Sequence, residues 1–251
     1  MAPEPPKFRY SNDSIMTSEA AKAFTWELPV PVNNFWDSFE YCVAGSFLWN
    51  FTDKEYEKLP IDPDCTDDQR TKSLFCIQLL KDKLAEEEAV TSPPNSLHTI
   101  DYKRWYRLWQ GIYTMQNVID LPEAEQTVRM LVATRPAQNF ESNVVPPHML
   151  ADHLVKIGKY EEAEEIERPV LVWMDAKPHL GKESPQAINA RRIIAKALWF
   201  QGLSRRAEAE ALVAEIHSIS EGMGGGKFGD YQEEEKRINE EMMAEIKSKG
   251  I

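Results

Sequence analysis

Two pairs of residues, each four positions apart, carry side chains that could do chemistry if the chain is helical there. His148 and Asp152 could orient one another as an acid and base pair, because positions i and i+4 are neighbours on a helix. Arg192 and Lys196 have the same spacing and could hold a carboxylate through charge-assisted hydrogen bonds. The alternatives are structural: Arg192 could instead pair with a neighbouring Glu. Both interpretations depend on which helix faces reach solvent.

Other chemical patterns are missing from the sequence. The glycine-rich run Gly222 to Gly229 fails the phosphate-loop pattern, because Lys227 is followed by Phe228 and not by Ser or Thr. No Gly-x-Ser-x-Gly elbow, His-Glu-x-x-His helix or dinucleotide fingerprint occurs. The three cysteines are widely spaced and the histidines are not clustered, which argues against a disulfide framework or a zinc site. We therefore expect no cofactor and no bound metal.

The charge balance excludes several classes of partner. The chain has 251 residues and a formal net charge of -12, so most of its surface repels nucleic acid and anionic lipid. No apolar run is long enough for a signal peptide or a membrane-spanning helix. Together with the free cysteines, these features predict a soluble protein of the cytoplasm with neither nucleic acid nor membrane as a partner.

Periodicity predicts an all-α protein. The long patterned segments have a period near 3.6 residues, and none after the Pro-rich breaker near residue 94 alternates as a strand would. We expect residues 1–20 to be a flexible arm and residues 21–251 to be a single all-helical domain. Within that domain, residues 230–249 are expected to form a charged C-terminal helix. The glycine run directly before this helix is expected to act as a hinge.

The first part of this domain, residues 21–90, is rich in Trp and is expected to form an N-terminal helical cap. Apolar residues recur every four positions there and predict a buried helix from about Asn33 to Asn50: Phe35, Phe39, Val43 and Phe47. A second helix is expected to run to about Ala89, opened by a capping box of Thr66 and Gln69. Its predicted apolar stripe consists of Leu74, Ile77, Leu80 and Leu84.

An internal repeat fills residues 102–219. Three segments align, and each places a turn before an Ala that is followed by Glu, at Ala124, Ala163 and Ala207. The intervals are about 40 residues, and amphipathic helical sequence surrounds each turn. A small side chain at this position lets two helices approach closely, so the pattern predicts stacked helical hairpins.

The turn Gly158-Lys-Tyr-Glu-Glu-Ala-Glu164 resembles that of the tetratricopeptide repeat (TPR) family. The longer interval, with Leu180-Gly181 and Ser184-Pro185 before the third pair, is similar to the kinesin-light-chain type and to fungal proteins with such repeats. The resemblance implies a short TPR-like α-solenoid, whose first helix in each pair lines a concave surface. In this chain the lining would be aromatic and basic, with His148 and Asp152 between its two ends: Tyr106, Trp109, Tyr113, Gln116, Asn189, Arg192, Lys196 and Trp199.

Two functions follow from this lining. The resemblance implies a binding module that recognises a peptide or protein segment in the groove, with Trp109 and Tyr113 giving apolar contact and Arg192 and Lys196 holding an acidic group. The alternative is a cofactor-independent enzyme of cyclase or isomerase type, which encloses a largely apolar small molecule. Residues such as His148 would then polarise the substrate. An open groove favours the first function and a closed pocket the second.

Overall fold

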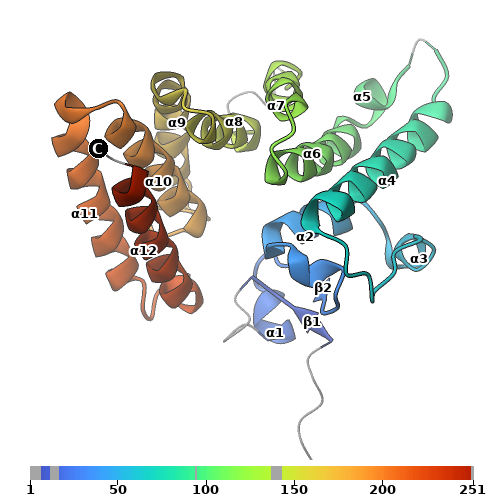
Figure 1. Ribbon diagram of the computed structural model, residues 1–251, viewed down its shortest axis with the longest axis horizontal. Helices are drawn as coiled ribbons and strands as arrows, with labels where there is room; N and C mark the ends of the chain where they lie inside the picture. The colour runs from blue at the N-terminus through green and yellow to red at the C-terminus, as the bar shows by residue number, and fades with distance from the viewer. Residues whose placement is uncertain (1–6, 12–16, 94, 137–142, 250–251) are drawn as a thin grey trace, which may run out of the picture. The chain divides into compact units, whose positions relative to one another are not determined.

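The computed structural model describes residues 7–11, 17–93, 95–136 and 143–249, and these are mostly helical with very little strand (Figure 1). The predicted all-α fold class is therefore confirmed. Two strands in this part of the chain, β1 (Phe8–Arg9) and β2 (Val30–Pro31), are two residues long and pair antiparallel. The chain separates into two compact units, Met1–Leu131 and Val132–Ile251.

Unit 1 is built around the packing of one long helix on three others. Its helices, with α7 reaching the boundary, are α1 (Ser18–Ala21), η1 (Trp36–Ser38), α2 (Tyr41–Leu48), α3 (Asp53–Tyr56), α4 (Gln69–Ala89), α5 (Leu97–Ile100), α6 (Tyr102–Val118) and α7 (Glu123–Ala133). Helix α6 packs against α2, α4 and α5. Gly111 makes the close approach to α2 possible, because a Cβ there would lie 2.9 Å from Asn50 Nδ2 and 3.1 Å from the Ser46 carbonyl oxygen.

The aromatic residues of unit 1 form its core, but not on one continuous helix. The predicted helix from Asn33 to Asn50 is divided into η1 and α2 by the extended backbone of Phe39 (φ -112°, ψ 145°). The predicted burial of the four apolar residues is confirmed for Phe35, Phe39, Val43 and Phe47. Trp36 is fully buried among these rings, and its Nε1 donates to the Tyr56 hydroxyl at 2.8 Å.

Helix α4 ends at Ala89 as predicted, although its cap differs from the expected one. Asp68 is the N-cap, and its Oδ1 accepts a hydrogen bond from the Thr71 N–H at 2.7 Å. Of the predicted apolar stripe, Ile77 and Leu80 are buried, whereas Leu74 is exposed.

Part of the predicted N-terminal arm is docked. Residues 1–6 and 12–16 lie outside the described part of the chain. Arg9, however, donates from NH2 to the backbone carbonyls of Trp36 at 2.8 Å and Phe39 at 2.6 Å. Residues 7–11 are thus held on unit 1 by β pairing and by a cation that binds the carbonyl of Trp36 in η1 and that of Phe39, its C-cap.

The helices of unit 2 pack around one central helix, α10. The elements of this unit are α8 (Val145–Lys156), α9 (Tyr160–Asp175), α10 (Pro185–Phe200), η3 (Leu203–Arg205), α11 (Arg206–Gly222), η4 (Gly229–Tyr231) and α12 (Gln232–Lys249). Helix α10 contacts α8, α9, α11 and α12. It carries four fully buried alanines, which let these neighbours pack close to its backbone: Ala187, Ala190, Ala195 and Ala197.

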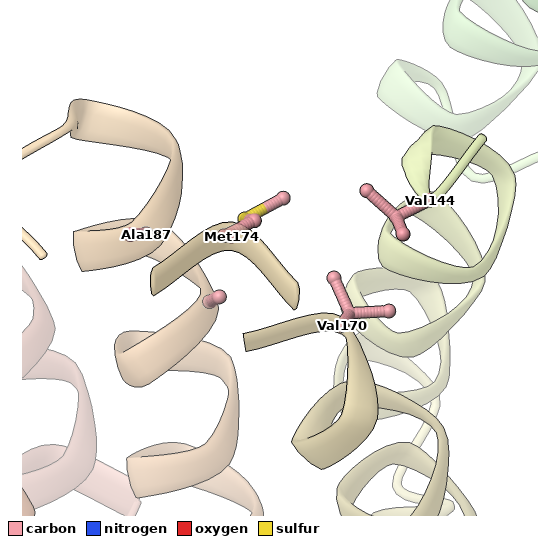
Figure 2. Close-up of a cluster of buried hydrophobic side chains, with 5 residues drawn as sticks. Val144, Val170, Met174 and Ala187 are labelled. Carbon is pink, nitrogen blue, oxygen red and sulfur yellow. The ribbon is translucent and has the colours of Figure 1, made fainter. Parts of the chain in front are cut away.

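A small apolar cluster joins the first three helices of unit 2. Figure 2 shows Val170 and Met174 of α9 between Val144, the N-cap of α8, and Ala187 of α10. All four side chains are at least nine-tenths buried. This cluster therefore fixes the ends of α8 and α10 on α9.

Two of the three predicted hairpins are packed helix pairs, α8/α9 and α10/α11, whereas α6 and α7 follow one another in the chain without packing closely together. Each turn contains a residue with a left-handed backbone: Asp120 (φ 54°), Gly158 (φ 82°) and Gly202 (φ 109°). The small residue of the second pair, Ala163, is fully buried as expected. In the third pair Ala207 is exposed and Ala209 is buried instead, because the inserted turn η3 delays the start of α11.

Candidate functional site

The two cations predicted to form a basic spot on α10 are bound to α12. Arg192 is buried, and its NH2 donates to Glu235 Oε2 at 2.5 Å, while its Nε donates to Asn239 Oδ1 at 2.7 Å. The Lys196 ammonium lies 2.6 Å from Glu245 Oε2. The prediction of an exposed basic spot is therefore wrong, and the alternative of an ion pair between Arg192 and a Glu is confirmed.

The physical reason is the polar seam of α12. Its buried positions recur at helical spacing, and the first two are polar: Glu235, Asn239, Met242 and Ile246. Burial lowers the pKa of Arg192 and raises that of Glu235, and the attraction between the two charges opposes both shifts. Asn239 completes the arrangement by donating from Nδ2 to the Ser220 hydroxyl at 2.8 Å. These partners of Arg192 could not be recognised from its neighbours in the sequence, because they lie more than forty residues away. The available indication was the high charge of the C-terminal helix itself.

His148 pairs with a residue that sequence spacing did not single out. Its Nδ1 lies 2.6 Å from Oε1 of the fully buried Glu167 on α9, and its Nε2 lies 3.1 Å from Asn189 Nδ2 on α10. Asp152 is exposed and acts on His148 only as a nearby negative charge. Both imidazole nitrogens are thus engaged within the fold, which does not leave His148 open as the acid or base of an enzyme.

The aromatic residues of α6 divide into a buried and a partly exposed set. Tyr113 and Gln116 are buried, so neither faces a ligand. Tyr106 and Trp109 are partly exposed, and each continues a series of rings on α6. The ring of Tyr106 stacks with that of Tyr102 at a centroid distance of 6.0 Å. Partly exposed Tyr and Trp side chains are typical of recognition surfaces.

Trp199, the last predicted lining residue, lies near the end of α10. The guanidinium of Arg206 covers its ring at 3.6 Å from the centroid, so one face of the indole is already occupied.

Lys103 and Arg107 of α6 were not predicted as site residues. Both are exposed and neither has an ion pair in the described part of the chain. They lie four residues apart, and Tyr106 falls on the same side of the helix. Helix α6 contains three cations and no Asp or Glu, which was the available sequence signal. The third cation, Arg104, is held by Glu87 and by the Asn50 carbonyl.

The described residues contain no group of three His, Cys, Asp or Glu side chains placed to hold a metal ion. None of the helices described is long and apolar enough to cross a bilayer. No family model, curated protein or solved structure matches the chain, so its resemblance to the TPR family remains a prediction from its own sequence.

Proposed function

We propose that this chain is a helical-hairpin binding module, of the TPR type that its sequence resembles, and that it recognises a peptide or protein segment carrying an acidic group. The proposed contact surface is the exposed side of α6, which we call the α6 face: Lys103, Tyr106 and Arg107. This surface replaces the one on α10 that the sequence predicted. A cytoplasmic location, with neither nucleic acid nor membrane as partner, is part of the proposal.

One observation carries the proposal that this chain binds an acidic segment. On a chain with net charge -12, the α6 face holds two exposed cations that form no ion pair with any described residue, next to a partly exposed tyrosine. An acidic segment would find charge-assisted hydrogen bonds from Lys103 and Arg107 and apolar contact from Tyr106. Ile100, which immediately precedes the α6 N-cap and is 59% exposed, extends the apolar part of the surface.

The contrast with α10 supports the choice. Arg192 and Lys196 already bind carboxylates of α12, and a ligand would have to displace that helix to reach them. Lys103 and Arg107 need no such displacement. The enzyme alternative has less support, because both nitrogens of its candidate His148 are engaged by Glu167 and Asn189.

The test begins with a random peptide library displayed against the full-length chain. We expect enrichment of peptides that combine Asp or Glu with an apolar residue. The affinity of one enriched acidic peptide is then measured by titration calorimetry with the wild type and with Lys103→Glu/Arg107→Glu. The double reversal should weaken binding about tenfold or more, since each hydrogen bond to a charged partner contributes about 1.5 to 3 kcal/mol.

A matched control is available in unit 1. Lys54 and Lys58 are also exposed and four residues apart, but acidic residues stand between and beside them in the sequence. Lys54→Glu/Lys58→Glu makes the same change in net charge and should leave affinity nearly unaltered. Equal losses in both double variants would show attraction by overall charge and would refute a specific α6 face, as would a library without acidic enrichment.

A further inference from the structure

Three polar side chains from three helices meet inside unit 2. His148 of α8 contacts Glu167 of α9 through Nδ1 and Asn189 of α10 through Nε2, at 2.6 Å and 3.1 Å. Glu167 is fully buried, and its second oxygen, Oε2, has no hydrogen-bond partner among the described residues. Among the described residues, the one cation beside this carboxylate is the imidazole of His148.

The imidazole can make these contacts in two protonation states. As a neutral ring it donates from Nδ1 to Glu167 and accepts at Nε2 from the Asn189 amide nitrogen. As an imidazolium it donates from both nitrogens, and Asn189 must turn its amide so that Oδ1 accepts from Nε2. The orientation of one amide on α10 therefore depends on one proton on α8.

The charges that act on His148 favour the imidazolium. Glu167 faces it from α9, Asp152 acts from one turn further along α8, and α10 contributes the uncharged amide of Asn189. Burial lowers the pKa of His148, but the attraction of Glu167 outweighs that effect and raises the pKa above its ordinary value. Loss of the proton leaves the buried Glu167 carboxylate without a countercharge, which is costly in a protein interior.

We propose that His148, Glu167 and Asn189 form a proton-operated clasp, which holds α8, α9 and α10 together when His148 is protonated and loosens them when it is neutral. The sign follows from the raised pKa: the stabilisation is complete below the ordinary pKa of His and is lost as pH rises through the folded-state value.

The clasp borders the apolar cluster of Figure 2. Val144 lies one turn before His148, and Val170 lies three residues after Glu167, on the same two helices. Ala190 follows Asn189 directly and belongs to this cluster. Loosening the clasp therefore acts on the packing that fixes α8 on its neighbours.

The test is amide hydrogen exchange of the full-length chain between pH 6 and pH 9, corrected for intrinsic exchange rates and read by segment. In the wild type, protection of residues 145–156 should fall several-fold with rising pH relative to α11 of the same unit. Glu167→Gln and His148→Gln should remove this pH dependence. His217→Gln, which alters an exposed histidine on α11, should preserve it.

Asn189→Asp provides the decisive variant. An aspartate at this position only accepts hydrogen bonds, so it favours the imidazolium and should move the midpoint of the transition to higher pH. The imidazole proton resonances of His148 in NMR spectra should titrate with the same midpoint. A fall in protection that persists in His148→Gln, or an unmoved midpoint in Asn189→Asp, would overturn the proposal even if one of the other variants failed to fold.

Discussion

The two units use their buried and partly buried cations in different ways. In unit 1, Arg9 and Lys72 donate to backbone carbonyls, and Lys72 Nζ lies 2.7 Å from the backbone carbonyl oxygen of Asn34. In unit 2, Arg191 binds Asp175 through two parallel hydrogen bonds of 3.0 Å and 2.7 Å, and Arg192 binds Glu235. Arg9 and Lys72 thus tie down backbone in unit 1, whereas Arg191 and Arg192 tie one helix of unit 2 to another.

The difference follows from the backbone of each unit. Residues 28–40 of unit 1 are mostly outside helices, so their carbonyls need donors from elsewhere. In unit 2 most residues lie in helices, where most carbonyls are satisfied, and several of its arginines pair with carboxylates of neighbouring helices. Unit 1 accordingly depends on aromatic packing around an irregular segment, and unit 2 depends on charged seams around α10.

The largest expected effect is in the aromatic core of unit 1. Trp36→Ala should lower the free energy of unfolding by about 5 kcal/mol, the upper end for such truncations, because the indole is fully buried and its Nε1 hydrogen bond is lost. Urea denaturation followed by circular dichroism measures this loss. Trp49→Ala is the control, since Trp49 is 42% exposed, and an equal loss there would refute the assignment of the core.

The second effect concerns the charged seam of unit 2. Glu235→Ala should cost about 3 kcal/mol, because it leaves Arg192 buried without its countercharge. Replacing both residues, as Arg192→Met/Glu235→Met, should recover most of that loss. If the double variant loses as much stability as the single one, the pair contributes more than mutual neutralisation and the account of the seam is wrong.

The third prediction compares Ala163 and Ala207, which occupy matching sequence positions in the second and third helix pairs. Ala163→Trp should destabilise by about 1 to 3 kcal/mol through overpacking, because Ala163 is fully buried. Ala207→Trp at the exposed matching position should change stability by less than about 0.5 kcal/mol. Thermal melts that rank the two variants in the opposite order would contradict the assigned turn geometry.

The smallest effect is a dependence on acid pH. Burial opposes ionisation of Glu164, but hydrogen bonds from Arg205, Gln201 and Arg168 outweigh it and lower its pKa to about 2. The stabilisation is present above the ordinary pKa of 4.5 and is lost as pH falls toward 2. We expect a contribution of roughly 1 kcal/mol, since its partners are partly solvated. Comparing acid unfolding of Glu164→Gln with the wild type checks it, and identical pH profiles would exclude the contribution.

The sequence predicted elements that local signals determine. Helix α4 ends where expected, and Ser184 caps α10 directly before Pro185, because caps and prolines act within a few residues. Phe39 is buried as predicted, but its backbone is extended and not helical. Its ring packs in the core without a continuous helix. Local signals were sufficient for the end of α4 and the start of α10, but not for the start of α4 or for the backbone between Asn33 and Asn50.

The site was less predictable because its partners are distant in sequence. Nothing near Arg192 indicated that Glu235 would cover it, and Glu167 is nineteen positions from His148. Lys103 and Arg107 could have been singled out from the lack of acidic residues in α6. The repeat register alone predicted that Arg192 and Lys196 contact a ligand, but both side chains bind carboxylates of α12.

The most direct test of this account measures stability and peptide affinity together for Arg192→Ala. We propose that Arg192 and Lys196 of α10 maintain the fold and that Lys103 and Arg107 of α6 bind the ligand. Arg192→Ala should therefore lower the melting temperature while an acidic peptide selected on the wild type binds each folded molecule with unchanged affinity. A variant that keeps its melting temperature and loses affinity would contradict the account and return the binding site to α10.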